Sequence, residues 1–302
     1  MPTTGPMRID PPAIGPSLSG TASPAGVRLG HWELTASLGE GAFCRVYRAR
    51  PASAPQRAAG YAIKVLHERW QHHPAAIATM AREAEVGRQV RHPHLASVLD
   101  ARTSSPPHFV VMPCLEGRSL ERLLAEGRLP LAESLWYARQ TAEGLAALDA
   151  AGWVHGDVKP GNLLIGPDGH ATLIDLGFAR RPGEVGSVLD RCLLGSIHYL
   201  APEMIVSTLR CDIRSDIYSL GVMLYQMLTG RRPFQGNDLA ELAQAHRQQR
   251  PPNLRSLAPE IPSGIASLVH RMLSKEPLRR PQSPARLVHR LAAFEVDSLV
   301  CR

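Results

Sequence analysis

Residues 154–162, VHGDVKPGN, place three side chains of different chemistry within six positions. Asp157 is a carboxylate that can accept the proton of an attacking hydroxyl, and Lys159 can neutralise negative charge that develops on a transferred phosphoryl group. Asn162 offers a side-chain oxygen of the kind that binds Mg²⁺. This spacing indicates a phosphoryl-transfer loop, in which His155 is more typical of a packed, hydrogen-bonded residue than of a base.

Three further ionisable residues lie far from this loop in the sequence. Asp175 follows the apolar run ATLI, where an unpaired carboxylate is costly unless it binds a cation. Lys64 stands in the strand-like run YAIKVL, and an inward-facing ammonium needs a phosphate or a carboxylate as its partner. A surface lysine on an edge strand is the alternative for that run. Glu83 and Glu85 point about 200° apart on a helix, so only one of them can face a sheet.

Residues 38–46, LGEGAFCRV, lie between two strand-like runs. Gly39 and Gly41 permit positive φ and allow the backbone to approach phosphates without Cβ clashes. Taken alone, this pattern is equally typical of a glycine-rich hairpin turn.

The elements around these residues change character along the chain. The strand-like runs WELTASL, CRVYRAR, YAIKVL, ASVLDA and HFVVM and a helix over 74–90 predict a five-stranded sheet with one helix. Apolar residues then recur at three- and four-residue steps from Leu131 to Leu148, and helices are predicted at 217–228, 263–273 and 283–293. A small β-rich lobe joined to a helical lobe places residues 113–117 beside a cleft.

Composition is ordinary for an enzyme of one or two lobes, with 44% hydrophobic and 20% charged residues in 302. The net charge of +7 comes from scattered arginines, which is typical of a solvated surface; a modest preference for anionic ligands is the alternative. No zinc-finger, helix-turn-helix or RNA-binding signature is present, so nucleic acid is not implied. Residues 1–30 contain 6 Pro and 5 Gly and are predicted to be a disordered tail.

The five cysteines are far apart and odd in number, which indicates a reduced, cytoplasmic set. They are Cys44, Cys114, Cys192, Cys211 and Cys301. The N-terminus lacks the apolar core of a signal peptide, and the apolar run 217–230 is too short to span a bilayer. We therefore expect a soluble protein without a membrane span.

In their order, these motifs resemble those of eukaryotic-type serine/threonine protein kinases of the kind found in bacteria. The series runs from the glycine-rich loop through Lys64, a helix glutamate, the catalytic loop and Asp175 in D-L-G to APE at 201–203. The resemblance covers about 31–297 and implies a bilobal α+β fold. It divides the chain into an N-lobe (31–112), a hinge (113–117), a C-lobe (118–297) and a short tail (298–302).

The resemblance implies the following roles. Lys64 would hold the α- and β-phosphates of ATP and pair with Glu83, which stands at the family's interval, while Asp157 would be the base with Lys159 beside it. Asn162 and Asp175 would bind Mg²⁺. Asp216 would brace the catalytic loop, and Glu203 would pair with Arg280. The remaining nucleotide contacts would come from the glycine-rich loop, the adenine pocket, the gatekeeper and the hinge: Leu38, Gly39, Gly41, Val46, Ala62, Leu164, Met112, Pro113 and Leu115.

Four positions depart from the family pattern. Gly156 replaces an arginine that anchors a phosphorylated activation loop in many kinases, and we predict activity that does not need that phosphorylation. Cys44 stands at the third glycine and predicts slightly weaker ATP binding. Gly87 lacks the large side chain expected against Leu176 and His155, which predicts a loose spine with a cavity. Leu176 itself is a mild apolar replacement in D-L-G.

Two other functions are compatible with parts of the pattern. A small-molecule kinase of the aminoglycoside or choline type shares H-G-D and a later Asp, but Lys159, Asp216 and Arg280 belong to the peptide-docking half of protein kinases. A pseudokinase scaffold is favoured by Cys44 and Gly87 and opposed by the intact catalytic set. Lys159 favours serine/threonine substrates. Ser119 and Gly161 occupy the family's acidic positions, so a strong preference for an upstream arginine is not predicted.

Overall fold

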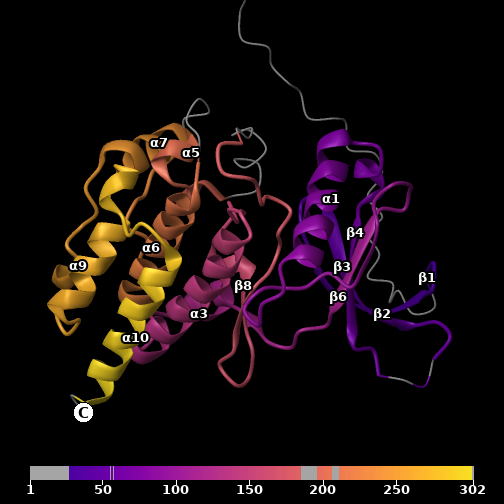
Figure 1. Ribbon diagram of the computed structural model, residues 1–302, viewed down its shortest axis with the longest axis horizontal. Coiled ribbons are helices and arrows are strands. Elements are labelled where there is room, and N and C mark those ends of the chain that lie inside the picture. Colours follow the sequence, from indigo (N-terminus) through magenta and orange to yellow (C-terminus); the bar gives the residue numbers. More distant parts are fainter. Residues whose placement is uncertain (1–26, 55, 57, 185–195, 206–210, 301–302) are drawn as a thin grey trace, which may run out of the picture.

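The computed structural model describes residues 27–54, 56, 58–184, 196–205 and 211–300. Two lobes lie side by side (Figure 1): a sheet with one long helix, and a set of helices that lies next to it. The chain passes from the first lobe to the second after β6 (Phe109–Pro113). The bilobal α+β fold is as predicted.

The N-lobe is built on a six-stranded antiparallel sheet, in the order β1-β2-β3-β4-β6-β5. One strand more is present than the sequence predicted, because Arg28 and Leu29 pair with Glu33 and Trp32. Structure therefore begins before His31, inside the segment expected to be a tail. The other strands are β1 (Arg28–Leu29), β2 (Trp32–Glu40), β3 (Cys44–Pro51), β4 (Tyr61–Leu66) and β5 (Asp100–Arg102).

The β5 strand is shorter than the predicted run ASVLDA. The amide of Ala96 donates instead to the carbonyl of Leu173 at 3.0 Å, and that of Val98 donates to the carbonyl of Gly87 at 2.9 Å. These amides hold the segment against the C-lobe and the helix, so the β5–β6 ladder begins only at Asp100.

Helix α1 (Pro74–Gln89) covers one face of the sheet (Figure 1). Its apolar side packs with Leu66, Val98 and Val110 in one cluster of buried residues. A second cluster, which includes Ile63 and Val111, belongs to the other face of the sheet. Because side chains alternate across a strand, β4 contributes to both clusters.

The C-lobe surrounds α6 (Ile213–Thr229), which is apolar nearly all round and buried along almost its whole length. Helix α3 (Leu131–Ala150) packs between α6 and α10 (Pro284–Val300), which continues into the predicted C-terminal tail. A three-stranded sheet of β7 (Arg118–Ser119), β8 (Leu163–Ile165) and β9 (Ala171–Leu173) faces the N-lobe side. The other helices are α2 (Leu120–Ala125), α5 (Pro202–Ile205), α7 (Leu239–Gln248), α8 (Leu254–Leu257) and α9 (Ser263–Met272).

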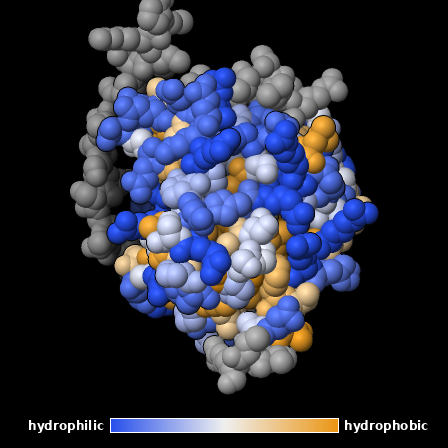
Figure 2. Space-filling view, turned by 90° about the vertical axis from the view of Figure 1, so that its left-hand side faces the viewer, coloured by the Kyte–Doolittle hydropathy of each residue, from blue (hydrophilic) through white to orange (hydrophobic). Residues whose placement is uncertain are grey.

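The end of the C-lobe is mostly hydrophilic, with apolar residues mainly in the lower part of the face and in a smaller patch at its upper right (Figure 2). Within the residues the structure describes, no helix has the length and hydropathy needed to cross a bilayer.

Candidate active site

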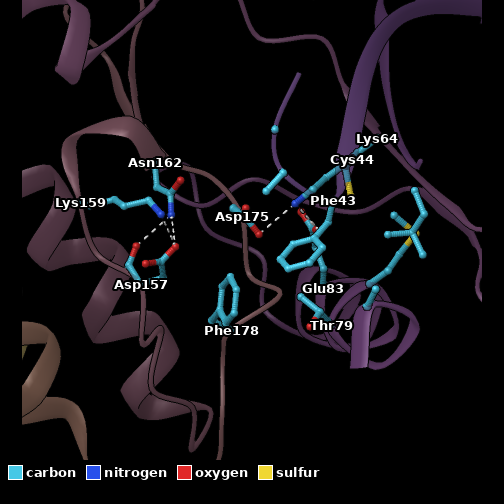
Figure 3. Close-up of a pocket in the computed structure, with 15 residues that line it drawn as sticks. Phe43, Cys44, Lys64, Thr79, Glu83, Asp157, Lys159, Asn162, Asp175 and Phe178 are labelled. Carbon is cyan, nitrogen blue, oxygen red and sulfur yellow. Dashed lines mark hydrogen bonds and ion pairs between the residues drawn. The ribbon is translucent and has the colours of Figure 1, made fainter. Parts of the chain in front are cut away.

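A cavity of about 310 Å³ lies between the glycine-rich loop, α1 and the two loops of the C-lobe that carry Asp157 and Asp175 (Figure 3). Seven of the residues predicted for the site line it: Gly41, Lys64, Glu83, Asp157, Lys159, Asn162 and Asp175. These residues come from five separate segments of the chain. The structure therefore brings the ionisable part of the predicted site together.

Lys64 lies at the centre of a partly buried charge cluster, in which Glu83 is the most deeply buried member. Its Nζ is 2.8 Å from Glu83 Oε2 and 2.9 Å from Asp175 Oδ1. Burial raises the pKa of Glu83 to about 7 against the attraction of Lys64, and the neighbouring Asp175 carboxylate adds to the increase. The ammonium of Lys64 keeps the pKa of Asp175 below its usual value despite burial. The choice of Glu83 over Glu85 is confirmed, because Glu85 is exposed.

The catalytic loop is organised by hydrogen bonds onto Asp157. Lys159 Nζ lies 2.8 Å from Asp157 Oδ2, and the Asn162 amide nitrogen donates to the same oxygen at 2.8 Å and to the Asp157 carbonyl at 2.9 Å. Asn162 is the last residue of the short 3₁₀ turn Pro160–Asn162, which leads into β8. The Asp157 carboxylate is consequently fixed at the wall of the cavity (Figure 3).

Helix α6 holds the loop that carries Asp157 through backbone hydrogen bonds. Asp216 of α6 accepts hydrogen bonds from the backbone N–H groups of His155 at 2.7 Å and Gly156 at 2.8 Å. Burial raises the pKa of Asp216 to about 7, although both hydrogen bonds oppose the shift. Gly156 has φ +76°, a conformation that glycine adopts without a Cβ penalty.

His155 is a structural residue, as predicted. It is fully buried, and its Nδ1 accepts a hydrogen bond from the Asp157 backbone N–H at 3.2 Å. Its Nε2 has no hydrogen-bond partner among the residues that the structure describes. Burial lowers the pKa of His155 to about 4, so the ring is neutral at neutral pH.

The donor set fits a magnesium ion. Since the amide nitrogen of Asn162 is committed to Asp157, its amide oxygen is left as a ligand, and Asp175 adds a carboxylate. The cavity is lined by three acidic side chains and two lysines, and a divalent cation would offset charge on the carboxylates. Mg²⁺ commonly takes one or two protein oxygen ligands and completes its shell with water and phosphate oxygens.

Asp175 has φ +68°, and it is the sole non-glycine residue in the described part of the chain with positive φ. This left-handed conformation is uncommon outside glycine, although aspartate tolerates it better than most residues. The next turn is equally constrained, since a Cβ on Gly177 would lie 2.6 Å from Thr79 Cγ2 of α1. Helix α1 and the segment after Asp175 are therefore packed in direct contact.

The residues predicted to contact adenine do not line this cavity. Ala62 of β4 pairs with Met112 of β6, and Leu164 lies in β8. The hinge is tied to the sheet because the amide of Cys114 donates to the carbonyl of Gly60 at 2.9 Å. The adenine contacts of Leu38, Gly39, Val46, Ala62, Met112, Pro113, Leu115 and Leu164 stay predictions.

Sequence reasoning missed the apolar wall of the cavity. Phe43 at the tip of the glycine-rich loop, Phe178 after the Asp175 turn, and Thr79 and Met80 of α1 all line it (Figure 3). The helix residues carried a usable signal, because Thr79 and Met80 precede Glu83 by four and three positions and so share its face. No comparable pattern marks Phe43 or Phe178.

The cavity predicted at Gly87 is absent, and the prediction was wrong. A Cβ on Gly87 would lie 2.6 Å from Val98 Cγ2, so the valine fills the space that a larger side chain would have taken. Val98 belongs to the buried cluster beneath α1, and Leu176 is 1% exposed. The packing here is tight because the backbone of residues 96–99 approaches the helix directly.

Cys44 occupies the third glycine position without disturbing the loop. Its side chain packs against the cluster under α1, and burial raises the pKa of its thiol to about 12. In the C-lobe, Glu203 and Arg280 form the predicted ion pair, which is buried and bidentate at 2.6 and 2.8 Å. Ser187, on which the activation-loop hypothesis depends, lies outside the described residues.

Comparison with known proteins agrees with this geometry. The family model described as "Protein kinase domain" matches residues 32–291. The chain is 35% identical to the serine/threonine-protein kinase pkn2 of Myxococcus xanthus over 87% of this chain and 32% of that protein. It is 33% identical to PknA of Mycobacterium tuberculosis over 77% and 54%, and 29% identical to PrkC of Bacillus subtilis over 89% and 41%, respectively. The chain thus spans about a third to a half of these curated relatives.

Proposed function

This chain belongs to the protein kinase domain family, and on that premise we propose that it transfers the γ-phosphoryl group of Mg-ATP to serine or threonine hydroxyls of proteins. The observation that carries the proposal is the convergence of Lys64, Asp157, Asn162 and Asp175 on one cavity. Their side chains supply the carboxylates, the amide oxygen and the ammonium group that phosphoryl transfer uses.

The contacts support a role for each residue. Asp157 accepts the proton of the substrate hydroxyl, and Lys159 beside it, at 2.8 Å, stabilises charge that develops on the phosphoryl group. Lys64, held by Glu83, neutralises the α- and β-phosphates. Asn162 and Asp175 would hold Mg²⁺, which would supply electrostatic stabilisation to the phosphate oxygens.

Protein substrates are favoured over small molecules by the C-lobe. The buried Glu203–Arg280 pair and the hydrogen bonds from the catalytic loop to Asp216 fix the framework beside which a peptide would lie. Gly161 stands at one of the family's acidic positions and has no carboxylate of its own. Glu121 Oε2 lies 3.5 Å from the place of a Cβ on Gly161, so one carboxylate is nevertheless close to this position. We propose at most a weak preference for a basic residue upstream of the phosphorylated hydroxyl, and a peptide array dominated by arginine there would refute this.

Activity independent of activation-loop phosphorylation is part of the proposal. Gly156 offers no guanidinium to hold a phosphorylated loop, and its N–H is already bound to Asp216. Ser187→Asp should therefore leave turnover nearly unchanged. A tenfold or larger rise in turnover would refute independence from activation-loop phosphorylation, but it would not contradict the proposed phosphoryl transfer.

The test is transfer of labelled phosphate from ATP to a generic basic protein. Asp157→Asn should abolish transfer, because the amide cannot accept the proton. Asp168→Asn is the matched control, since Asp168 only accepts a backbone hydrogen bond in the β8–β9 turn. Nucleotide binding without transfer by the wild-type protein would favour a pseudokinase scaffold, and phosphorylation of small alcohols in place of protein would favour a small-molecule kinase.

A further inference from the structure

The glycine-rich loop is held from outside by the segment that follows β4. Three consecutive carbonyl groups of the loop accept hydrogen bonds from this segment. His67 Nε2 lies 2.9 Å from the carbonyl oxygen of Gly41, and the His67 amide donates to the carbonyl of Phe43 at 2.8 Å. Between them, the Ala42 carbonyl accepts from Trp70 Nε1 at 3.1 Å and from Arg69 at 3.2 Å.

Aromatic packing reinforces these bonds. The ring of Phe43, at the tip of the loop, meets the ring of Trp70 edge-on, with 4.9 Å between their centroids. Arg69 places its guanidinium 5.8 Å from the centroid of the Trp70 ring. Phe43 and Trp70 both pack against the buried cluster under α1, so the loop tip is anchored to the N-lobe core.

The bonding leaves donors for an anion on the loop. The Gly41 amide donates to the carbonyl of Cys44 at 2.8 Å, which closes the turn. The amides of Ala42 and Phe43 donate to no other residue in the described part of the chain. When three successive carbonyls are fixed, the peptide planes between them are fixed too, and their N–H groups are preorganised for phosphate oxygens.

We propose that His67, Arg69 and Trp70 form a latch that positions the glycine-rich loop for the phosphates of the nucleotide, with Arg69 and Trp70 as positioning residues. The inference rests on the proposed function, since it concerns how that site holds ATP. The latch should affect the binding of the phosphates of the nucleotide and not the binding of its adenosine part. The adenosine half lies toward β6 and the hinge, which none of the three residues contacts through a hydrogen bond.

The experiment compares the binding of Mg-ATP and of adenosine by calorimetry. Trp70→Phe keeps the aromatic ring and removes the indole N–H. Arg69→Ala, at an exposed position, removes the other donor to Ala42 without altering the core. Trp136→Phe is the matched control, because Trp136 Nε1 also donates to a backbone carbonyl, that of Gly169 at 3.0 Å, but lies in the C-lobe away from the cavity.

Trp70→Phe should raise the Kd of Mg-ATP about threefold to tenfold, the effect expected from one net hydrogen bond, and should change the Kd of adenosine less than about twofold. Arg69→Ala should act in the same direction, the double variant should exceed either single one, and Trp136→Phe should change neither Kd. Equal weakening of ATP and adenosine, or no difference between Trp70→Phe and Trp136→Phe, would overturn the latch. A wild-type protein that binds neither ligand would overturn the proposed function as well, whereas tight ATP binding by every variant would overturn the latch alone.

Discussion

The backbone N–H of Gly156 donates a hydrogen bond to Asp216 Oδ1 at 2.8 Å, across sixty positions of sequence. The neighbouring His155 amide binds the other carboxylate oxygen. Asp216→Ala would leave both buried N–H groups without an acceptor, and we expect it to lower the free energy of unfolding by about 2–4 kcal/mol. Urea denaturation measures this. Ser219→Ala, which removes only a hydroxyl bonded within α6, should cost less than about 1 kcal/mol, and equal losses in the two variants would contradict the bracing role.

Glu83 and Glu85 provide a matched pair for testing the buried ion pair. Glu83→Gln removes the negative charge that faces Lys64 at 2.8 Å, so the ammonium is held by Asp175 alone. We expect kcat/KM to fall about tenfold to a hundredfold, in line with the loss of a charge-assisted hydrogen bond of about 1.5–3 kcal/mol. Glu85→Gln, at an exposed position of the same helix, should leave kcat/KM within twofold. Steady-state kinetics with a basic protein substrate decides between these results.

Gly87 should not tolerate a side chain while Val98 is present. Gly87→Ala places a Cβ 2.6 Å from Val98 Cγ2, and overpacking of this kind costs about 1–3 kcal/mol in the free energy of unfolding. Val98→Ala alone should also destabilise the protein, because it opens a cavity. In the double variant the new methyl group occupies part of that cavity. The loss of unfolding free energy in the double variant should therefore be smaller than the sum of the losses in the two single variants. Strict additivity in urea denaturation would show that the two positions do not share this space.

His155 should contribute to acid destabilisation. Burial lowers its pKa to about 4 from 6.5, so above pH 6.5 the ring is neutral in both the folded and the unfolded chain. As the pH falls below 6.5, the unfolded chain takes up a proton that the folded protein does not, and stability is lost until the pH reaches about 4. Between pH 7.5 and 5 we expect His155 to account for about 2 kcal/mol of the decrease in unfolding free energy.

The variant His155→Phe should be less stable at pH 7.5, because the Asp157 amide loses its acceptor, but should show a shallower decrease toward pH 5. His289→Phe, at an exposed position of α10, serves as the control and should keep the slope of the wild-type protein. Urea denaturation at the two pH values measures both variants. Parallel pH profiles for His155→Phe and the wild-type protein would contradict the assignment.

The sequence was most informative where a charged residue stands in an apolar run. Lys64 in YAIKVL and Asp175 after ATLI each required a partner of opposite charge. In the structure Lys64 contacts both Asp175 and Glu83. For Lys64 and Asp175, the cost of burying a charge made a distant contact predictable from local composition. The contact of Asp216 with residues 155–156 was expected from the family resemblance alone.

Contacts made through backbone groups escaped prediction. Ala96 and Val98 belong to a strand-like run, yet their amides bind Leu173 and Gly87, so the strand is short. The latch of His67, Arg69 and Trp70 likewise depends on side chains that contact backbone carbonyls of the loop. No residue pattern predicts such contacts. The space beside Gly87 was misjudged for the same reason, since the approach of a loop backbone decided what fills it.

The burial of Cys44 bears on covalent chemistry at the nucleotide cavity. Cys44 lines the cavity, but burial raises the pKa of its thiol to about 12, so the thiol stays protonated at neutral pH. Electrophilic inhibitors need the thiolate as their nucleophile, so an acrylamide or chloroacetamide warhead seated there would react slowly. Peroxide would oxidise this position slowly for the same reason, so the protein should keep its glycine-rich loop unmodified through purification in air.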